Sequence, residues 1–186
     1  ASVTDCKGAG EIQVQAGASQ AVYTGGIAGL GQALQRCLAA GDVSVQAEGG
    51  MAYTGGILGA AWQTAGILPS VDRCAAWNPS LSGGVVHRIV GEPLPDGQIR
   101  FGRNIAHAAL PSFGQEADGE TAAETGADFW LEFLPEPWGI SSTGTDALPS
   151  IEASRTPLQI EPDVFQVIAG TGGYEGVAPY DTLEIQ

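Results

Sequence analysis

Two histidines could carry acid–base chemistry in this chain. His87 and His107 are the only histidines, and imidazole gains and loses its proton near neutral pH. We expect a hairpin over residues 84–105, in which His107 shares a face with Arg103 while His87 faces the other way. Arg103 would then polarise a substrate oxygen and His107 would act as acid or base. Alternatively, both are ordinary surface or half-buried histidines. No Gly-x-Ser-x-Gly elbow indicates a serine nucleophile.

A pair of carboxylates flanks a tryptophan. Residues 127–133 read as a strand, which places Asp128, Trp130 and Glu132 on one face. If that face lines an apolar cavity, burial raises a carboxyl pKa and Glu132 becomes a proton shuttle. If the face meets water, the two carboxylates only favour solubility, and the sequence leaves both interpretations open.

Aromatic residues supply the candidate substrate contacts. Tyr23, Tyr53 and Tyr174 each accompany a Thr-Gly-Gly segment. A phenol can donate a hydrogen bond to a substrate, or it can simply anchor packing. We assign Tyr174 as a catalytic hydrogen-bond donor and Tyr23 and Tyr53 as substrate-binding. The further pocket residues are Trp130 and Trp138, and Trp138 stands between proline and glycine as a candidate lid.

Charge and composition exclude several classes of protein. The net charge is −14, with one lysine, Lys7, among only seven basic residues. Nucleic-acid binding needs clustered basic side chains, so we expect none. Residues 12–35 and 49–71 are long uncharged runs, but Gly, Gln, Thr and Ser dilute them, so we expect no membrane insertion.

The cysteines indicate neither a metal site nor one disulfide pairing. The chain has three cysteines, Cys6, Cys37 and Cys74. At most one disulfide can form among them, and it would leave the third thiol free. Pairing of Cys6 with Cys37, or of Cys37 with Cys74, remains open. The spacing lacks any zinc signature, and we expect no metal and no cofactor. The chain begins at Ala1 without Met, so either a signal peptide has been removed or the chain has been trimmed, and we expect a secreted or extracellular rather than a cytoplasmic protein.

An internal repeat organises the first third of the chain. Residues 14–27 and 45–57 share Val-Gln-Ala followed by Tyr-Thr-Gly-Gly-Ile. Solenoids need at least three stacked units, so two full copies favour a duplicated supersecondary unit instead. A phosphate-binding loop is disfavoured because no Lys-Ser/Thr follows the glycines.

The elements that must position these residues are mostly strands. We expect strands over 11–15 and 42–46, a hairpin from 84–92 to 98–105 with its turn at Asp96-Gly97, and a strand over 127–133. Residues 51–68 fit either a curved strand pair or a buried helix. Short helices are expected over 31–40 and 70–77, loops over 111–124 and 135–150, and further strands over 151–160, 163–169 and 182–186. Together they predict one mainly β domain over 1–186, a small antiparallel barrel of about eight strands, closed or nearly closed.

One segment near the C-terminus carries a resemblance. Val167-Ile168-Ala169-Gly170-Thr171-Gly172-Gly173-Tyr174-Glu175-Gly176-Val177 resembles the Gly-Thr/Ser-Gly-x-Tyr/Phe-x-Gly signature of the allene oxide cyclase and dirigent-protein barrel superfamily. The resemblance covers about a dozen residues. It implies an eight-stranded barrel around an apolar pocket that folds a reactive intermediate without a cofactor. Some members form homo-oligomers, which implies the same option here.

The function expected from these observations is cofactor-independent cyclisation or isomerisation of a small apolar substrate. Catalysis would come mainly from holding the substrate in its reactive fold. The alternatives are a secreted small-molecule carrier or glycan-binding β-domain without catalysis, and a structural or adhesive β-module. A filled interior together with an exposed apolar patch would favour the last.

Overall fold

The computed structural model describes residues 2–17, 21–64, 66–92, 97–122, 126–140 and 148–151. All of them belong to the first of two compact units, Ala1–Glu152. The resembling segment with Tyr174 and the strands expected over 152–186 therefore lie outside the described residues. The single-domain assignment stays a prediction.

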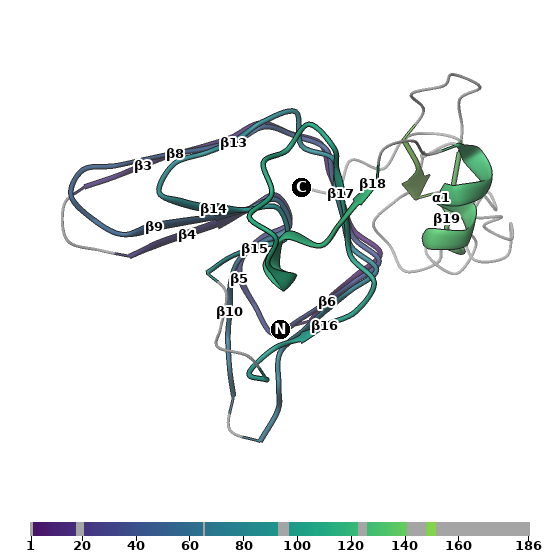
Figure 1. The fold of residues 1–186 in the computed structure, drawn as a ribbon, viewed down its shortest axis with the longest axis horizontal. Helices are drawn as coiled ribbons and strands as arrows, with labels where there is room; N and C mark the ends of the chain where they lie inside the picture. Colours follow the sequence, from purple (N-terminus) through teal and green to yellow (C-terminus); the bar gives the residue numbers. More distant parts are fainter. Residues whose placement is uncertain are drawn as a thin grey trace, which may run out of the picture. The chain divides into compact units, whose positions relative to one another are not determined.

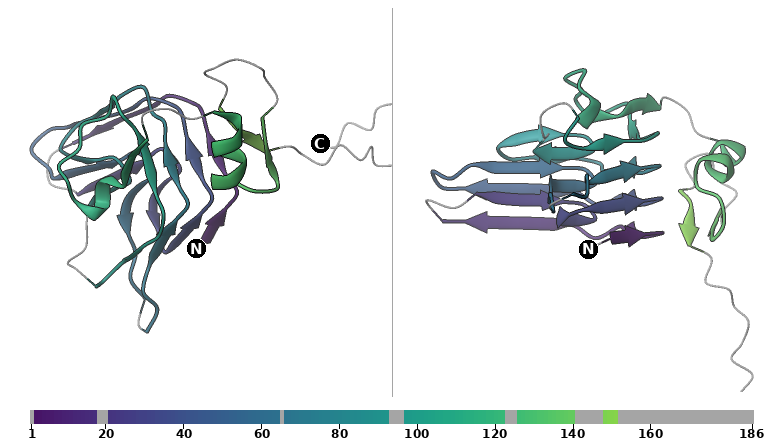
Figure 2. Two further views of the ribbon diagram at one scale, coloured as in Figure 1. Left: turned by 45° about the vertical axis from the view of Figure 1, so that its right-hand side comes forward. Right: turned by 90° about the horizontal axis from the view of Figure 1, so that it is seen from below.

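The described chain winds into a parallel β-solenoid (Figure 1). Three successive coils each contribute five short strands, and a partial fourth coil follows. Strands at equivalent places in successive coils lie above one another, which Figure 2 shows as stacked layers. Coil 1 holds β1 Ser2–Thr4, β2 Lys7–Gly8, β3 Ile12–Ala16, β4 Val22–Gly25 and β5 Ala28–Gly31. Coil 2 holds β6 Ala33–Gln35, β7 Leu38–Ala39, β8 Val43–Ala47, β9 Ala52–Gly55 and β10 Leu58–Ala61. Coil 3 holds β11 Ser70–Asp72, β12 Ala75–Ala76, β13 Leu81–Ser82, β14 Val85–His87 and β15 Val90–Glu92. Coil 4 holds β16 Arg100–Phe101 and β17 Ile105–His107, and β18 Glu120–Ala122 pairs beyond β17.

The antiparallel barrel prediction is wrong. Every strand of the coils pairs in parallel with its counterpart one coil away. Ser2 pairs with Ala33, which is 31 residues on, Ala33 with Ser70, which is 37 on, and Ser70 with Arg100, which is 30 on. Alternating side chains predict strands over 11–15 and 42–46, and β3 and β8 confirm both. Alternation says nothing about whether a strand's partner runs parallel or antiparallel, and the repeat decides that here.

The repeat has a third, altered copy that makes the solenoid. Tyr23 pairs with Tyr53, and Tyr53 pairs with Val85. Val86-His87-Arg88-Ile89-Val90-Gly91 therefore stands where coil 2 has Thr54-Gly55-Gly56-Ile57-Leu58-Gly59. The interpretation as a duplicated unit was wrong because His87 and Arg88 replace the two glycines by which the motif was recognised.

Glycine is required at the bend between the fourth and fifth strands of a coil, which are β4 and β5 in coil 1 and β9 and β10 in coil 2. A Cβ on Gly55 would lie 2.7 Å from the Gly91 nitrogen, and one on Gly59 would lie 2.6 Å from the Gly29 oxygen. Real Cβ atoms do not approach backbone this closely. The Thr-Gly-Gly-Ile-x-Gly motif is thus a packing device that lets successive coils stack at this bend.

Both helices expected in the first half are wrong. Residues 31–40 form β6 and β7, and residues 70–77 form β11 and β12. Between the strands of each pair, Arg36 and Arg73 have a positive φ of 49°, which turns the chain sharply. Leu34 before the corner and Leu38 after it are both buried. Their spacing of four residues is also the spacing of buried residues on one face of a helix.

The expected hairpin is also wrong. Val86 pairs with Thr54 and Val90 with Leu58, whereas the hairpin would have paired them with His107 and Arg103. The turn residue Asp96 lies outside the described residues, and β16 and β17 continue into coil 4. Two strands joined by a tight turn and two strands that follow one another in a coil have the same local sequence pattern, so the pattern alone cannot tell them apart.

The predicted strand over 127–133 is a helix, α1 Ala127–Phe133. Trp130, Phe133 and Leu134 are buried against Leu38, Ala75 and Ile105 of the β2–β7–β12–β17 sheet. Helical spacing therefore places Trp130 and Phe133 on one face, and a strand would have separated them. The expected loops contain a 3₁₀ helix, η1 Glu116–Asp118, together with β18 and the short β19 Trp138–Gly139, which pairs antiparallel with β20 Ser150–Ile151.

Side chains fill the interior of the coils. Leu34, Ile57, Val71, Ile89 and Val90 are each at most 1% exposed and belong to one cluster. Ile27, Ile57 and Ile89 follow one another up the stack, linked by backbone hydrogen bonds of 3.0 and 3.2 Å. The inside of this part of the protein is a packed core, and the central cavity of a barrel is absent from the described coils.

Candidate functional site

Two of the predicted catalytic residues meet at the surface. Arg103 Nη1 lies 3.3 Å from Glu132 Oε1, with the two side chains 49% and 76% exposed. Arg103 also lies over the Phe133 ring, 5.6 Å from its centre. An exposed ion pair of this kind contributes little to stability. Because the Glu132 side chain is exposed to water, it does not lie in the apolar cavity that the proton-shuttle prediction requires. The pair lies at the edge of the contact between α1 and coil 4, which the buried Trp130 and Phe133 hold together.

His107 and the two predicted pocket tryptophans serve the same docking. The His107 ring meets Trp77 edge-on at 5.0 Å, and Trp77 meets Trp130 edge-on at 4.9 Å. Nδ1 of His107 accepts a hydrogen bond from the Ala109 amide at 3.2 Å. Trp138 is buried and its Nε1 donates to Asp5 Oδ1 at 3.0 Å. The predicted pocket lid is therefore an anchor that binds this segment to coil 1.

Asp5 is the polar centre of that anchor. It accepts hydrogen bonds from Arg36 Nε at 2.7 Å and from Trp138. The Arg36 hydrogen bond lowers the pKa of Asp5 more than its partial burial raises it. Asp5 therefore stays charged and holds coil 1, coil 2 and the segment after α1 together.

Tyr23 and Tyr53 do lie together, on strands β4 and β9 and apart from the residues around α1. Their rings stack with centres 5.4 Å apart and planes 11° from parallel. Partial burial and the nearby Glu92 carboxylate raise the pKa of Tyr23. Each ring covers one face of the other, and their assignment as substrate-binding residues stays a prediction. The stacked pair packs coil 1 against coil 2.

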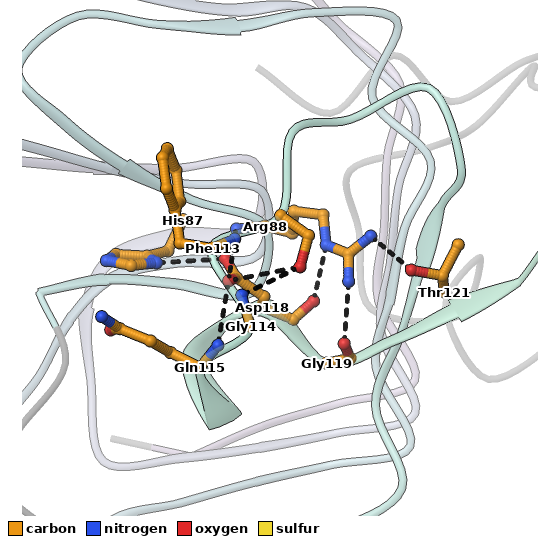
Figure 3. Close-up of polar contacts among 9 residues, drawn as sticks. His87, Arg88, Phe113, Gly114, Gln115, Asp118, Gly119 and Thr121 are labelled. Atoms are coloured by element: carbon orange, nitrogen blue, oxygen red, sulfur yellow. Dashed lines mark hydrogen bonds and ion pairs between the residues drawn. The ribbon is translucent and has the colours of Figure 1, made fainter.

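A buried polar cluster closes coil 3, and sequence analysis missed it (Figure 3). His87 Nδ1 lies 3.0 Å from Asp118 Oδ1. Oδ2 of Asp118 accepts from the Phe113 amide at 2.7 Å and the Gln115 amide at 3.3 Å. Burial raises the pKa of Asp118, but these hydrogen bonds lower it by more, so the net shift is downward.

Arg88 completes the cluster. Its guanidinium donates to the Asp118 carbonyl at 3.0 Å, to the Gly119 carbonyl at 2.9 Å and to Thr121 Oγ1 at 2.8 Å. Burial lowers its pKa, and the Asp118 charge opposes that shift. Because β13, β14 and β15 have no further neighbour in the described sheets, this end of the stack has room for the side chains that Gly55 and Gly56 must lack.

The cluster has the composition of a catalytic dyad without its geometry. The nearby hydroxyl, Ser112 Oγ, lies 3.5 Å from Asp118 Oδ2, so it contacts the carboxylate. A nucleophile would have to contact the histidine on the side away from the carboxylate. The signal that could have found the cluster is His-Arg at the Gly-Gly place of the third repeat. The cluster of His87, Arg88 and Asp118 caps the coil 3 end of the stack.

A projecting apolar hairpin is the remaining unusual surface. Between β10 and β11 the coil is lengthened, and residues 62–64 and 66–69 stand out from the stack at the bottom of Figure 1. Trp62 is 61% exposed, Ile67 58% and Leu68 38%, and Leu30 on the adjacent β5 is 50% exposed. Residues 62–70 contain no charged side chain. We call Trp62, Ile67, Leu68 and Leu30 the apolar hairpin patch.

The hairpin is firmly rooted. The Trp62 amide donates to the Gly31 carbonyl at 2.7 Å, and the Ser70 amide donates to the Gln32 carbonyl at 2.8 Å. Thr64 and Ile67 bridge antiparallel within it. Both ends are thus held by neighbouring residues of coil 1, next to Leu30, so the patch is presented on a fixed base.

Neither a metal centre nor a membrane-spanning helix is found in the part of the chain that the structure describes. Among those residues, no three His, Cys, Asp or Glu side chains are arranged to hold a metal ion. No described helix is long and apolar enough to cross a bilayer. Comparisons with protein-family models, curated proteins and solved structures found no match.

Proposed function

We propose that this chain is a non-catalytic adhesive β-module that contacts a macromolecular partner through the apolar hairpin patch. The observation that carries the proposal is an uncharged hairpin with three large exposed apolar side chains, in a chain of net charge −14. Insertions into a solenoid repeat commonly form the binding face. Clustered exposed apolar residues on a folded domain mark interaction sites.

A cofactor-free cyclase or isomerase remains the alternative, but its expected barrel is replaced by a parallel solenoid in the described residues. It required an apolar pocket inside a barrel, and the coils are filled. Of its four catalytic candidates, Arg103 and Glu132 form an exposed ion pair, His107 packs on Trp77, and Tyr174 lies outside the described residues. The cyclase, a secreted location and a homo-oligomer stay predictions.

Adsorption to surfaces of defined polarity tests the proposal. The full chain is applied to octyl-coated and hydroxyl-coated beads, and bound protein is measured against concentration. A variant with Trp62→Ser, Ile67→Ser and Leu68→Ser should need at least tenfold more protein for half-saturation of the octyl beads. Burying each such side chain contributes roughly 1.5 to 3 kcal/mol, and 1.4 kcal/mol is tenfold in affinity.

Matched controls separate the patch from general stickiness. Leu131 on α1 and Val85 on β14 are 48% and 47% exposed, comparable with Leu30 but remote from the hairpin in sequence. Leu131→Ser combined with Val85→Thr should leave adsorption within twofold of the parent. Equal adsorption by the hairpin variant and the parent would show that the patch is not the contact surface.

A further inference from the structure

The three cysteines occupy one column of the solenoid. The carbonyls of Cys6, Cys37 and Cys74 each accept a hydrogen bond from the next coil, from Leu38 at 2.9 Å, Ala75 at 2.8 Å and Ile105 at 3.0 Å. The cysteines follow Asp5, Arg36 and Arg73, whose positive φ values mark the same corner in each coil. Asn104 takes the fourth place in the column and accepts from the Cys74 amide at 3.0 Å.

This column brings neighbouring thiols within bonding reach. Adjacent strands lie about 4.8 Å apart, inside the Cα separation of roughly 4.4 to 6.8 Å that a disulfide spans. The residues that follow the cysteines pair in register, Lys7 with Leu38 and Leu38 with Ala75, so Cys37 lies between Cys6 and Cys74. Cys6 and Cys74 are two coils apart, about twice the strand spacing, which is too far. Two pairings are therefore available, and Cys37 belongs to both.

The three cysteines differ in their exposure to solvent. Cys37 and Cys74 are 0% exposed, whereas Cys6 is half-buried, because coil 1 has no coil on its outer side among the described residues. A dissolved oxidant therefore reaches Cys6 first. All three thiols are free in the structure.

We propose that Cys6, Cys37 and Cys74 form a disulfide relay that carries oxidation by a low-molecular-weight disulfide from the open end of the solenoid into its core. The chain has no other cysteine, so within it each thiol can form a disulfide only with its neighbour in the column. This inference is independent of the proposed adhesive function.

The relay consists of three thiol–disulfide exchanges. The Cys6 thiolate attacks glutathione disulfide, breaks its S–S bond, forms a mixed disulfide and releases one glutathione, which takes up the proton that Cys6 lost. Cys37 then attacks the Cys6 sulfur, forms the Cys6–Cys37 disulfide and releases the second glutathione. Finally Cys74 attacks Cys37, forms Cys37–Cys74 and returns Cys6 to the thiol. Overall, two thiols are oxidised and one glutathione disulfide is reduced.

The environments favour Cys37 as the second thiol to react. The hydrogen bond from Cys74 lowers the pKa of Cys37 by more than burial raises it, while burial raises the pKa of Cys74 well above its usual value. Thiolate is the attacking species, so Cys37 is the better nucleophile of the two buried thiols. The Cys6–Cys37 bond should therefore appear before the Cys37–Cys74 bond.

Peptide mapping under non-reducing conditions tests the relay. The folded chain is incubated with glutathione disulfide, quenched with iodoacetamide at intervals and digested. We expect a Cys6–Cys37 cross-linked peptide first and a Cys37–Cys74 peptide later, with the first declining as the second grows. Stable glutathione on Cys6 without any internal cross-link, or a Cys6–Cys74 peptide, would overturn the proposal.

Two variants test the order of steps. Cys6→Ser should slow formation of the Cys37–Cys74 disulfide at least tenfold, since the remaining thiols are buried. Cys37→Ser should accumulate glutathione on Cys6 and form no internal disulfide. Circular dichroism checks that each variant is folded. If Cys37→Ser does not fold, the order in which the two cross-linked peptides appear in the parent chain tests the relay. Oxidation of Cys6→Ser at the parent's rate would refute Cys6 as the point of access.

Discussion

Replacing Gly56 with alanine should destabilise the solenoid by about 3 kcal/mol, the upper end for overpacking a core. The new Cβ would clash with the Arg88 carbonyl and lie 2.7 Å from Asn78 Oδ1 and 2.8 Å from the Ala76 Cβ. All three of these atoms belong to the next coil, whose backbone is held by hydrogen bonds such as Ile57 to Ile89 at 3.2 Å. The neighbours cannot withdraw without parting the coils.

Thermal unfolding followed by far-ultraviolet circular dichroism measures the effect. A loss of about 3 kcal/mol should lower Tm by roughly 6 to 12 °C in a protein of this size. Gly10→Ala is the matched control, because a Cβ there meets nothing within 4 Å and the backbone has no positive φ. It should leave stability unchanged or raise it by about 0.4 to 1 kcal/mol through the unfolded chain. Equal Tm values for the two variants would refute the stacking role of the repeated glycines.

The capping cluster and the α1 docking give two more predictions. Asp118→Asn should cost about 3 kcal/mol at pH 7, since it removes the buried charge and replaces one of the two accepting oxygens with an NH₂ group that cannot accept from His87 or the backbone amides. The folded pKa of Asp118 lies below its ordinary value of 3.8, so its stabilisation is complete above that pH and is lost as the pH falls through the lower folded pKa. Guanidinium unfolding at pH 7 and pH 3 should therefore show a smaller difference between variant and parent in acid, and a constant difference would contradict this role. Trp130→Ala should cost about 3 to 5 kcal/mol and expose the α1 segment to limited proteolysis, whereas Arg103→Gln, at an exposed pair, should cost at most about 1 kcal/mol; equal losses would show that α1 is not held by its buried ring.

Several features of the fold could be predicted from local pattern. The alternation of Ile12 and Val14 with glutamines predicts the strand that β3 confirms. The repeated Tyr-Thr-Gly-Gly-Ile correctly marks two equivalent segments, which pair residue for residue. Local patterns failed where the chain turns corners, as at Arg36, because a corner between two strands buries the same spacing of residues as a helix does.

Candidate residues fared differently according to what surrounds them. The stacked pair Tyr23 and Tyr53 could be anticipated from the repeat, since equivalent residues in successive coils lie above one another. The meeting of Arg103 with Glu132 depends on a helix that folds back from beyond β18, which no local pattern reveals. The cluster of His87 with Asp118 joins residues 31 apart across the end of the stack, where β13, β14 and β15 have no further neighbour among the described strands.

By itself, the amino-acid sequence determined that the chain is rich in strands, strongly acidic and internally repeated, because alternation, charge and self-similarity are properties of neighbouring residues. Tertiary structure alone decided that the strands pair in parallel from coil to coil, that the interior is filled, and that the cysteines share one column. These outcomes depend on which segments come to lie against each other, and the hydrogen-bonding groups of a strand are the same whichever direction its partner runs.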